Sequence, residues 1–283
     1  MTIRRRCPSV GRVATSAPPE QAARLPFRTA LRAELHRAFA PPYEAPVVVV
    51  VNGLLVTGAW FLLPDDSVFR VHTAWFFPLA LASWMLSDVP ATNVLGSDSA
   101  RMSLALDRTP ELRRRLDAKN VVLWLLVVPV CVLIAIGVAF AGSDGSVLTV
   151  LATIVALVTV PFGTLAFAGW LGTRWPYHVL PLRVRWKHRR PYRRMVVRWL
   201  VLVFIPYLFV PLIAGLLLLP VLAGWRLTSG SWSPTSDRAF ALGALALAAI
   251  AVLAWLAGRA ITLRSVGRRT AELRTFLDDQ YRG

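Results

Sequence analysis

Six long apolar windows constrain this chain more than any other feature of its sequence. None of the six contains Asp, Glu, Lys or Arg. About 20 helical residues, rising 1.5 Å each, cross the hydrocarbon core of a bilayer, where a central charge costs at least about 2.5–3.5 kcal/mol. The sequence therefore predicts an all-α protein, a polytopic membrane helical bundle of six transmembrane helices. The predicted spans are about 46–63, 71–87, 120–141, 146–170, 199–225 and 239–257.

Positive residues between the windows predict the orientation of the bundle. Of the 32 Lys and Arg residues, 29 fall in alternate segments, at 1–45, 88–119, 171–198 and 258–283. Cytoplasmic segments of membrane proteins carry such an excess, so both termini are expected in the cytoplasm. The formal net charge of +17 is then explained by topology and by anionic lipids at the cytoplasmic face, and not by nucleic acid. The excess of Arg over Lys is typical of a GC-rich bacterial genome, which suggests a bacterial plasma membrane.

The segments outside the membrane domain (43–258) have distinct patterns. Residues 1–25 are expected to form a disordered basic cytoplasmic tail, and 259–283 a second basic cytoplasmic tail. Residues 26–42 are expected to form an amphipathic helix that lies at the membrane interface, because apolar side chains recur every four residues between arginines. These apolar residues are Phe27, Leu31, Leu35 and Phe39. Packing of this helix on another part of the same protein is the alternative.

The 88–119 connection is expected to be an ordered helical hairpin. Asn93 to Gly96 has the composition of a turn, and Ser97 or Asp98 is placed to cap a short helix that ends near 106. The run Thr109-Pro110-Glu111 is a strong helix start, and this second helix is expected to continue into the third span. Such a hairpin would offer a docking surface to a soluble partner, whereas a plain connector is the alternative.

Motifs for catalysis or for a bound cofactor are missing from the sequence. It holds no HExxH and no Cys/His cluster for a metal, no GxSxG for a nucleophile, and no GxxxxGK[ST] loop for a nucleotide phosphate. We therefore expect no cofactor, no metal site and no enzymatic activity in this chain itself.

The layout resembles the permease subunits of ABC-2-type transporters, a class of bacterial exporters. Those proteins have six spans, cytoplasmic termini, an amphipathic helix before the first span and a coupling helix between the second and third. The local match lies in the hairpin. It is carried by Asn93, Gly96, Asp98, Leu104, Leu106, Pro110 and Lys119-Asn120.

The resemblance implies a membrane subunit that works as a homodimer or with a sister permease. Two separate ATPase subunits would dock on the 88–119 hairpin and drive export. The residues expected to contact the ATPase are Asp98, Arg101, Met102, Arg108 and Glu111. Two other functions stay open: a non-transport membrane scaffold or assembly partner whose basic loops face lipid, and a lipid-modifying membrane enzyme.

Overall fold

The computed structural model describes residues 26–41, 43–62, 76–86, 89–141, 146–178, 193–230 and 236–279. Three segments discussed above lie wholly or mostly outside the described residues. They are the predicted disordered tail 1–25, the basic connection between the fourth and fifth predicted spans, and the last four residues. Within the described ranges the regular structure is helical and no strand occurs. The predicted all-α class is therefore confirmed for this part of the chain.

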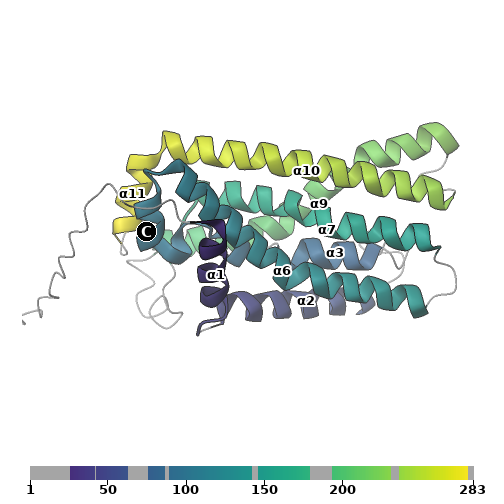
Figure 1. Cartoon of the computed structure of the whole chain (residues 1–283), viewed down its shortest axis with the longest axis horizontal. Coiled ribbons are helices and arrows are strands. Elements are labelled where there is room, and N and C mark those ends of the chain that lie inside the picture. Colours follow the sequence, from purple (N-terminus) through teal and green to yellow (C-terminus); the bar gives the residue numbers. More distant parts are fainter. Residues whose placement is uncertain are drawn as a thin grey trace, which may run out of the picture.

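Long helices lie side by side along the molecule, and most of the short ones gather at one of its ends, whereas α3 (Phe76–Met85) lies among the long helices (Figure 1). The long helices are α2 (Glu44–Leu62), α6 (Thr109–Ala141), α7 (Val147–Arg174), α9 (Arg193–Ser229) and α10 (Asp237–Arg268). The shorter ones are α1 (Phe27–Ala38), α3 (Phe76–Met85), α4 (Val89–Thr92), the 3-10 helix η2 (Gly96–Asp98), α5 (Ser99–Ala105) and α11 (Thr270–Asp278).

Four of the described helices are long and apolar enough to cross a membrane. They are α2, α6, α7 and α10, and together they indicate a multi-pass membrane protein. The other two predicted windows hold α3, described over 10 residues, and α9, whose apolar segment with described side chains is Leu216–Ser229. The count of six spans and the cytoplasmic position of both termini stay predictions.

Small residues let α7 and α10 pack closely along much of their length. Ala152 and Ala156 of α7 share a buried cluster with Ala241 and Ala244 of α10. Further along, a Cβ atom at Gly258 would lie 2.7 Å from the Cβ of Ala166. Membrane helices commonly associate through such small residues, because backbones can then approach closely. The α7–α10 pair is therefore the firmest packing unit of the bundle.

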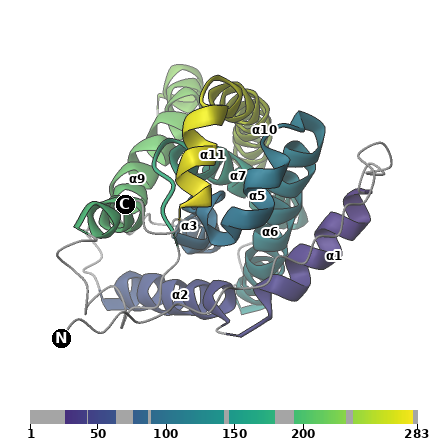
Figure 2. The ribbon, with the colours of Figure 1, turned by 90° about the vertical axis from the view of Figure 1, so that its left-hand side faces the viewer.

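We call the end of the bundle that holds the short helices the charged end. It comprises α1, η2, α5, the first turns of α6, the last turns of α10, and α11. Figure 2 looks onto this end and shows α11 and α5 in the foreground, with α1 on the outside beside α6. In Figure 1, α1 crosses the direction of the long helices. If the long helices cross a membrane at right angles, α1 therefore lies parallel to the membrane surface.

Candidate docking site at the charged end

The predicted turn at Asn93–Gly96 is present and is closed by the Asn93 side chain. Its Oδ1 accepts from the backbone N–H of Gly96 at 3.1 Å, and its Nδ2 donates to the carbonyl of Tyr177 at 3.1 Å. A glycine is needed at 96, because a Cβ atom there would collide with that same Tyr177 carbonyl oxygen. The turn therefore ties the hairpin to the chain that follows α7.

Lys119 holds this turn against α6. The side chain is buried, with 4% of its surface exposed. Its Nζ donates to the Asn93 carbonyl at 2.7 Å and to the Ser97 Oγ at 2.9 Å. A buried ammonium is tolerated when it is hydrogen-bonded, so these acceptors account for its position. Asn93, Gly96 and Lys119, three residues that carry the resemblance noted above, thus lie in one hydrogen-bonded network.

The short helix of the hairpin begins without the side-chain cap that the sequence predicts. Asp98 occupies the N-cap position of α5, but its carboxylate makes no capping hydrogen bond. It lies instead 3.5 Å from the guanidinium of Arg101, and the Ser97 hydroxyl accepts from Lys119. The prediction of a cap at Ser97 or Asp98 is therefore wrong, because Asp98 pairs with Arg101 of α5 and Ser97 with the distant Lys119.

A groove separates α1 from the hairpin, and we call it the α1–hairpin groove. It encloses about 240 Å³. Four of the five predicted partner-contact residues line it: Asp98, Arg101, Met102 and Glu111. The remaining lining residues are Ala30, Ala33, Glu34, Arg114 and Arg115. The structure therefore brings together most of a set that was chosen from the sequence alone.

The fifth predicted residue, Arg108, stands at the edge of this set. Its guanidinium lies 3.8 Å from the Glu111 carboxylate, although Arg108 does not line the groove. The side chains of Arg101 and Arg108 are 58% and 53% exposed. A partner that approaches the groove would therefore meet two accessible guanidinium groups first.

Charges of both signs line the α1–hairpin groove and are partly paired within it. Arg115 donates to Glu111 at 2.6 Å, and Arg37 of α1 pairs with Glu34. Arg37 also donates to the backbone carbonyl of Ser97 at 3.1 Å, which fixes α1 to the hairpin. Both pairs are half-buried and join residues three or four apart in one helix, and such pairs contribute little stability, so they can exchange partners at low cost. The groove suits a partner surface that carries mixed charges.

The apolar stripe of the predicted interface helix is only partly covered by the bundle. No residue of α1 is buried, and Phe27 and Phe39 are 39% and 53% exposed. Ala30, Ala33 and Glu34 instead face the hairpin across the groove. Within the stripe, Leu31 and Leu35 are half-buried, and Phe27 and Phe39 at its two ends are exposed.

The segment predicted as a basic tail (259–283) is ordered over much of its length and closes the charged end. Continuing from α10, α11 buries Leu273, Phe276 and Leu277 in a cluster with Met102 and Leu106 of the hairpin. A signal for this helix was available in the sequence, because these three apolar residues have i, i+3, i+4 spacing. The prediction of a tail gave that signal no weight.

Polar contacts at both ends of α11 reinforce this packing. His178 Nε2 lies 2.8 Å from the Phe276 carbonyl oxygen, and the Ser103 hydroxyl donates to Asp278 at 2.6 Å. At the start of the helix Arg269 donates to Glu272 at 2.7 Å, and this hydrogen bond raises the pKa of Arg269. The chain after α7, the hairpin and α11 therefore form one connected unit.

The described residues contain no group of three or more His, Cys, Asp or Glu placed to hold a metal ion. Comparison with protein-family models, with curated proteins and with solved structures finds no match to this chain. Its function is therefore inferred from its own residues and their geometry.

Proposed function

We propose that this chain is the membrane-embedded permease subunit of an ATP-driven exporter of the ABC-2 type. Separate ATPase subunits would dock at the α1–hairpin groove. One observation carries the proposal: the groove formed by the predicted contact residues opens at the start of α6, and α6 continues as one helix from Thr109 to Ala141. A partner bound at the groove is thereby connected to the apolar part of the bundle.

The continuity of α6 would let a partner that moves the hairpin also move the membrane part of the bundle. Its 33 residues extend about 50 Å at 1.5 Å per residue, which exceeds the thickness of the hydrocarbon core. Displacing the hairpin would therefore displace the membrane part of the same helix. ATP drives such a change only if the partner contacts the groove differently in its two states. The exposed Arg101 and Arg108 are the groups that would make those contacts.

The remaining features of the proposal concern placement. The chain would span a bacterial plasma membrane six times, with both termini in the cytoplasm, and pair with itself or with a sister permease. The partly exposed apolar stripe of α1 would rest among the lipids of the inner leaflet, and arginines such as Arg28 and Arg32 would meet anionic headgroups. The orientation of α1 across the long helices supports this placement (Figures 1 and 2).

Affinity purification from native membranes in a mild detergent tests the proposal. We expect a soluble P-loop protein to co-elute in near-stoichiometric amount, together with ATP hydrolysis. An eluate with no such subunit would overturn the exporter assignment. If that eluate held only other membrane proteins, the scaffold function would take its place.

A charge-reversal pair tests the docking site itself. Arg101→Glu combined with Arg108→Glu should remove the co-eluting ATPase while leaving membrane insertion unchanged, because both side chains are more than half exposed. Arg264→Glu combined with Arg268→Glu is the matched control, since both arginines are exposed on α10 at the same end and neither lines the groove. Equal ATPase recovery from both double variants would reject the groove as the docking site.

A further inference from the structure

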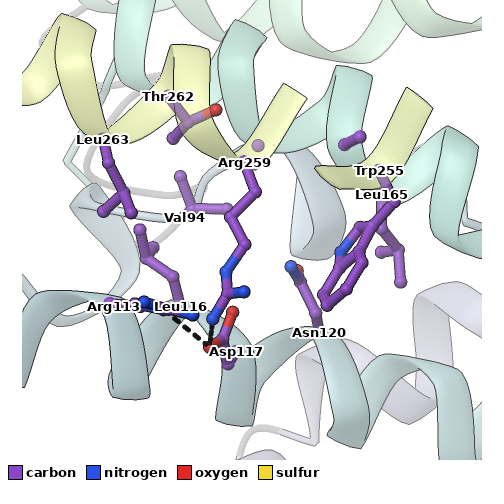
Figure 3. A pocket seen from close by; sticks show the side chains of 12 residues that line it. Val94, Arg113, Leu116, Asp117, Asn120, Leu165, Trp255, Arg259, Thr262 and Leu263 are labelled. Atoms are coloured by element: carbon purple, nitrogen blue, oxygen red, sulfur yellow. Dashed lines mark hydrogen bonds and ion pairs between the residues drawn. The ribbon is translucent and has the colours of Figure 1, made fainter. Parts of the chain in front are cut away.

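A second cleft lies between α6 and α10, with α7 behind it, and we call it the α6–α10 cleft (Figure 3). Arg113 and Asp117 line it from α6, Trp255 and Arg259 from α10, and Gly169 from α7. Beyond the cleft, toward the middle of the bundle, α6 and α10 are mostly apolar. Toward the charged end, both helices carry many charged residues. In a membrane the cleft would therefore lie at the depth of lipid headgroups.

The polar half of the cleft carries excess positive charge. Arg259 pairs with Asp117 across the cleft, and Arg113 Nε lies 4.0 Å from the same carboxylate. Two guanidinium groups thus share one carboxylate. The Arg259 guanidinium also lies 5.2 Å from the centre of the Trp255 ring, a cation–π contact that orients both side chains.

Two hydrogen-bond donors in the cleft lack an acceptor. The Nε of Arg259 and the Nε1 of Trp255 are buried and have no hydrogen-bond partner within the described part of the chain. Leaving a buried donor unpaired is costly, more so when the donor is charged. The enclosed part of the cleft holds about 20 Å³, which is room for one oxygen-sized atom. The geometry therefore suits a single oxygen that reaches in from a larger molecule outside.

A row of aromatic rings continues from Trp255 beyond the cleft. The ring of Trp255 lies 5.3 Å from that of Phe162 on α7, and Phe162 stacks on Trp124 of α6 at 6.2 Å. Trp124 lies two helical turns beyond Asp117, in the direction of the apolar part of the bundle. From the cleft toward the apolar part of the bundle, the side chains thus change from charged groups to aromatic rings, as a phospholipid changes from its phosphate to its acyl chains.

We propose that the α6–α10 cleft binds the headgroup of a membrane phospholipid through one of its phosphate oxygens. Arg259 and Trp255 donate to that oxygen, and Arg113 contributes the second positive charge. The glycerol and the first acyl carbons lie over the aromatic row of Trp255, Phe162 and Trp124. The α1–hairpin groove shares none of these residues, so this inference is independent of the exporter assignment.

Native mass spectrometry of the full chain, purified in a mild detergent and titrated with phosphatidylglycerol, tests the site. Trp255→Phe keeps the ring and removes its N–H, and Arg259→Gln removes the guanidinium. A hydrogen bond to a charged group is worth about tenfold in affinity, so we expect each variant to raise the lipid Kd about tenfold. Trp60→Phe and Arg238→Gln make the same changes away from the cleft and should leave the lipid Kd unchanged.

Three results would overturn the proposal. The first is a lipid Kd for Trp255→Phe equal to that of the native chain, and this variant decides alone if Arg259→Gln fails to fold. The second is displacement of phosphatidylglycerol by soluble glycerol phosphate at an equal concentration, which would make a free phosphate ester the ligand. The third is a cryo-electron microscopy map of the chain in lipid nanodiscs that shows only a water between Trp255 and Arg259.

Discussion

Two short amphipathic helices, α1 and α11, lie at the charged end and use their apolar faces in different ways. Helix α11 buries Leu273, Phe276 and Leu277 to 1%, 7% and 2% exposure, whereas α1 buries none of its residues. Both helices carry arginine and acidic side chains on their other faces. Amphipathic spacing therefore identifies an apolar face, but it does not identify what covers that face.

The position of each helix along the chain explains the difference. Arg269 alone separates α11 from α10, so α11 folds back at once onto the hairpin beside the end of α10. Helix α1 packs against α6 from the outside, and Ala30, Leu31, Glu34 and Leu35 are half-buried there. Phe27 and Phe39 stay exposed at the two ends of the stripe, and the interface of a bilayer is the surface that fits the proposed location.

Truncating one phenylalanine of α11 and one at the end of α1 should give the largest contrast. Phe276→Ala removes a buried ring from the cluster beneath α11, and such changes cost about 3–5 kcal/mol. Phe39→Ala removes a half-exposed ring and should cost less than about 1 kcal/mol in detergent. Thermal unfolding of both variants in the same detergent measures the contrast. Equal losses of stability would show that the two apolar faces are covered alike.

Lipid contact should differ several-fold between the two helices. A fluorescent probe attached at Phe39→Cys should be quenched strongly by brominated lipids in nanodiscs, because α1 is expected to lie at the interface. The matched probe at Thr275→Cys, on the exposed side of α11, should be quenched weakly. Comparable quenching at both positions would contradict the interface placement of α1.

Removing one hydroxyl should loosen α11 by a smaller amount. Ser103→Ala deletes the hydrogen bond from α5 to Asp278, which should cost about 1 kcal/mol and speed proteolysis of the C-terminal segment. Thr275→Ala is the control, since that hydroxyl donates to Ala271 within α11. Limited proteolysis followed by mass spectrometry compares the two. A faster release from Thr275→Ala would argue against the interhelix bond as the cause.

Breaking the surface ion pair of α11 should have the smallest effect on stability. Arg274 pairs with Asp107 of the hairpin, and the two side chains are 42% and 60% exposed. Arg274→Gln should cost less than about 1 kcal/mol, and the loss should vanish at about 1 M salt because exposed pairs are screened. The unfolding temperature at low and at high salt checks both parts. A loss that persists in high salt would indicate packing by the arginine stem instead.

Local sequence patterns predicted those parts of the charged end whose structure depends on residues that are close together in the sequence. The turn at Asn93, the start of α6 at Thr109 and the position of α1 all follow from spacing, proline and glycine. The same reasoning did not find the Arg259–Asp117 pair, because its two residues are separated by 142 positions. Contacts of that kind depend on how α6 and α10 pack against α7, and no local pattern encodes that packing.

The burial of one predicted contact residue could not be read from the sequence for a related reason. Met102 was proposed as a contact for a partner, yet it is buried beneath α11 and is exposed by only 4%. Arg101 and Arg108 of the hairpin are exposed because an unpaired charge is costly to bury, whereas a methionine is as well suited to a core as to an interface. Met102 is buried because α11, which is distant in the sequence, covers the hairpin.

The chain holds only two lysines, Lys119 and Lys187, and the burial of Lys119 makes it a built-in reporter. An acylating reagent reaches the Nζ of Lys119 only when the turn at Asn93 has opened, because that nitrogen is enclosed by its acceptors. The rate of acylation at this one amine would therefore measure how often the charged end opens in the folded protein. Peptide mass spectrometry would follow this rate in intact membranes, without any substitution in the chain.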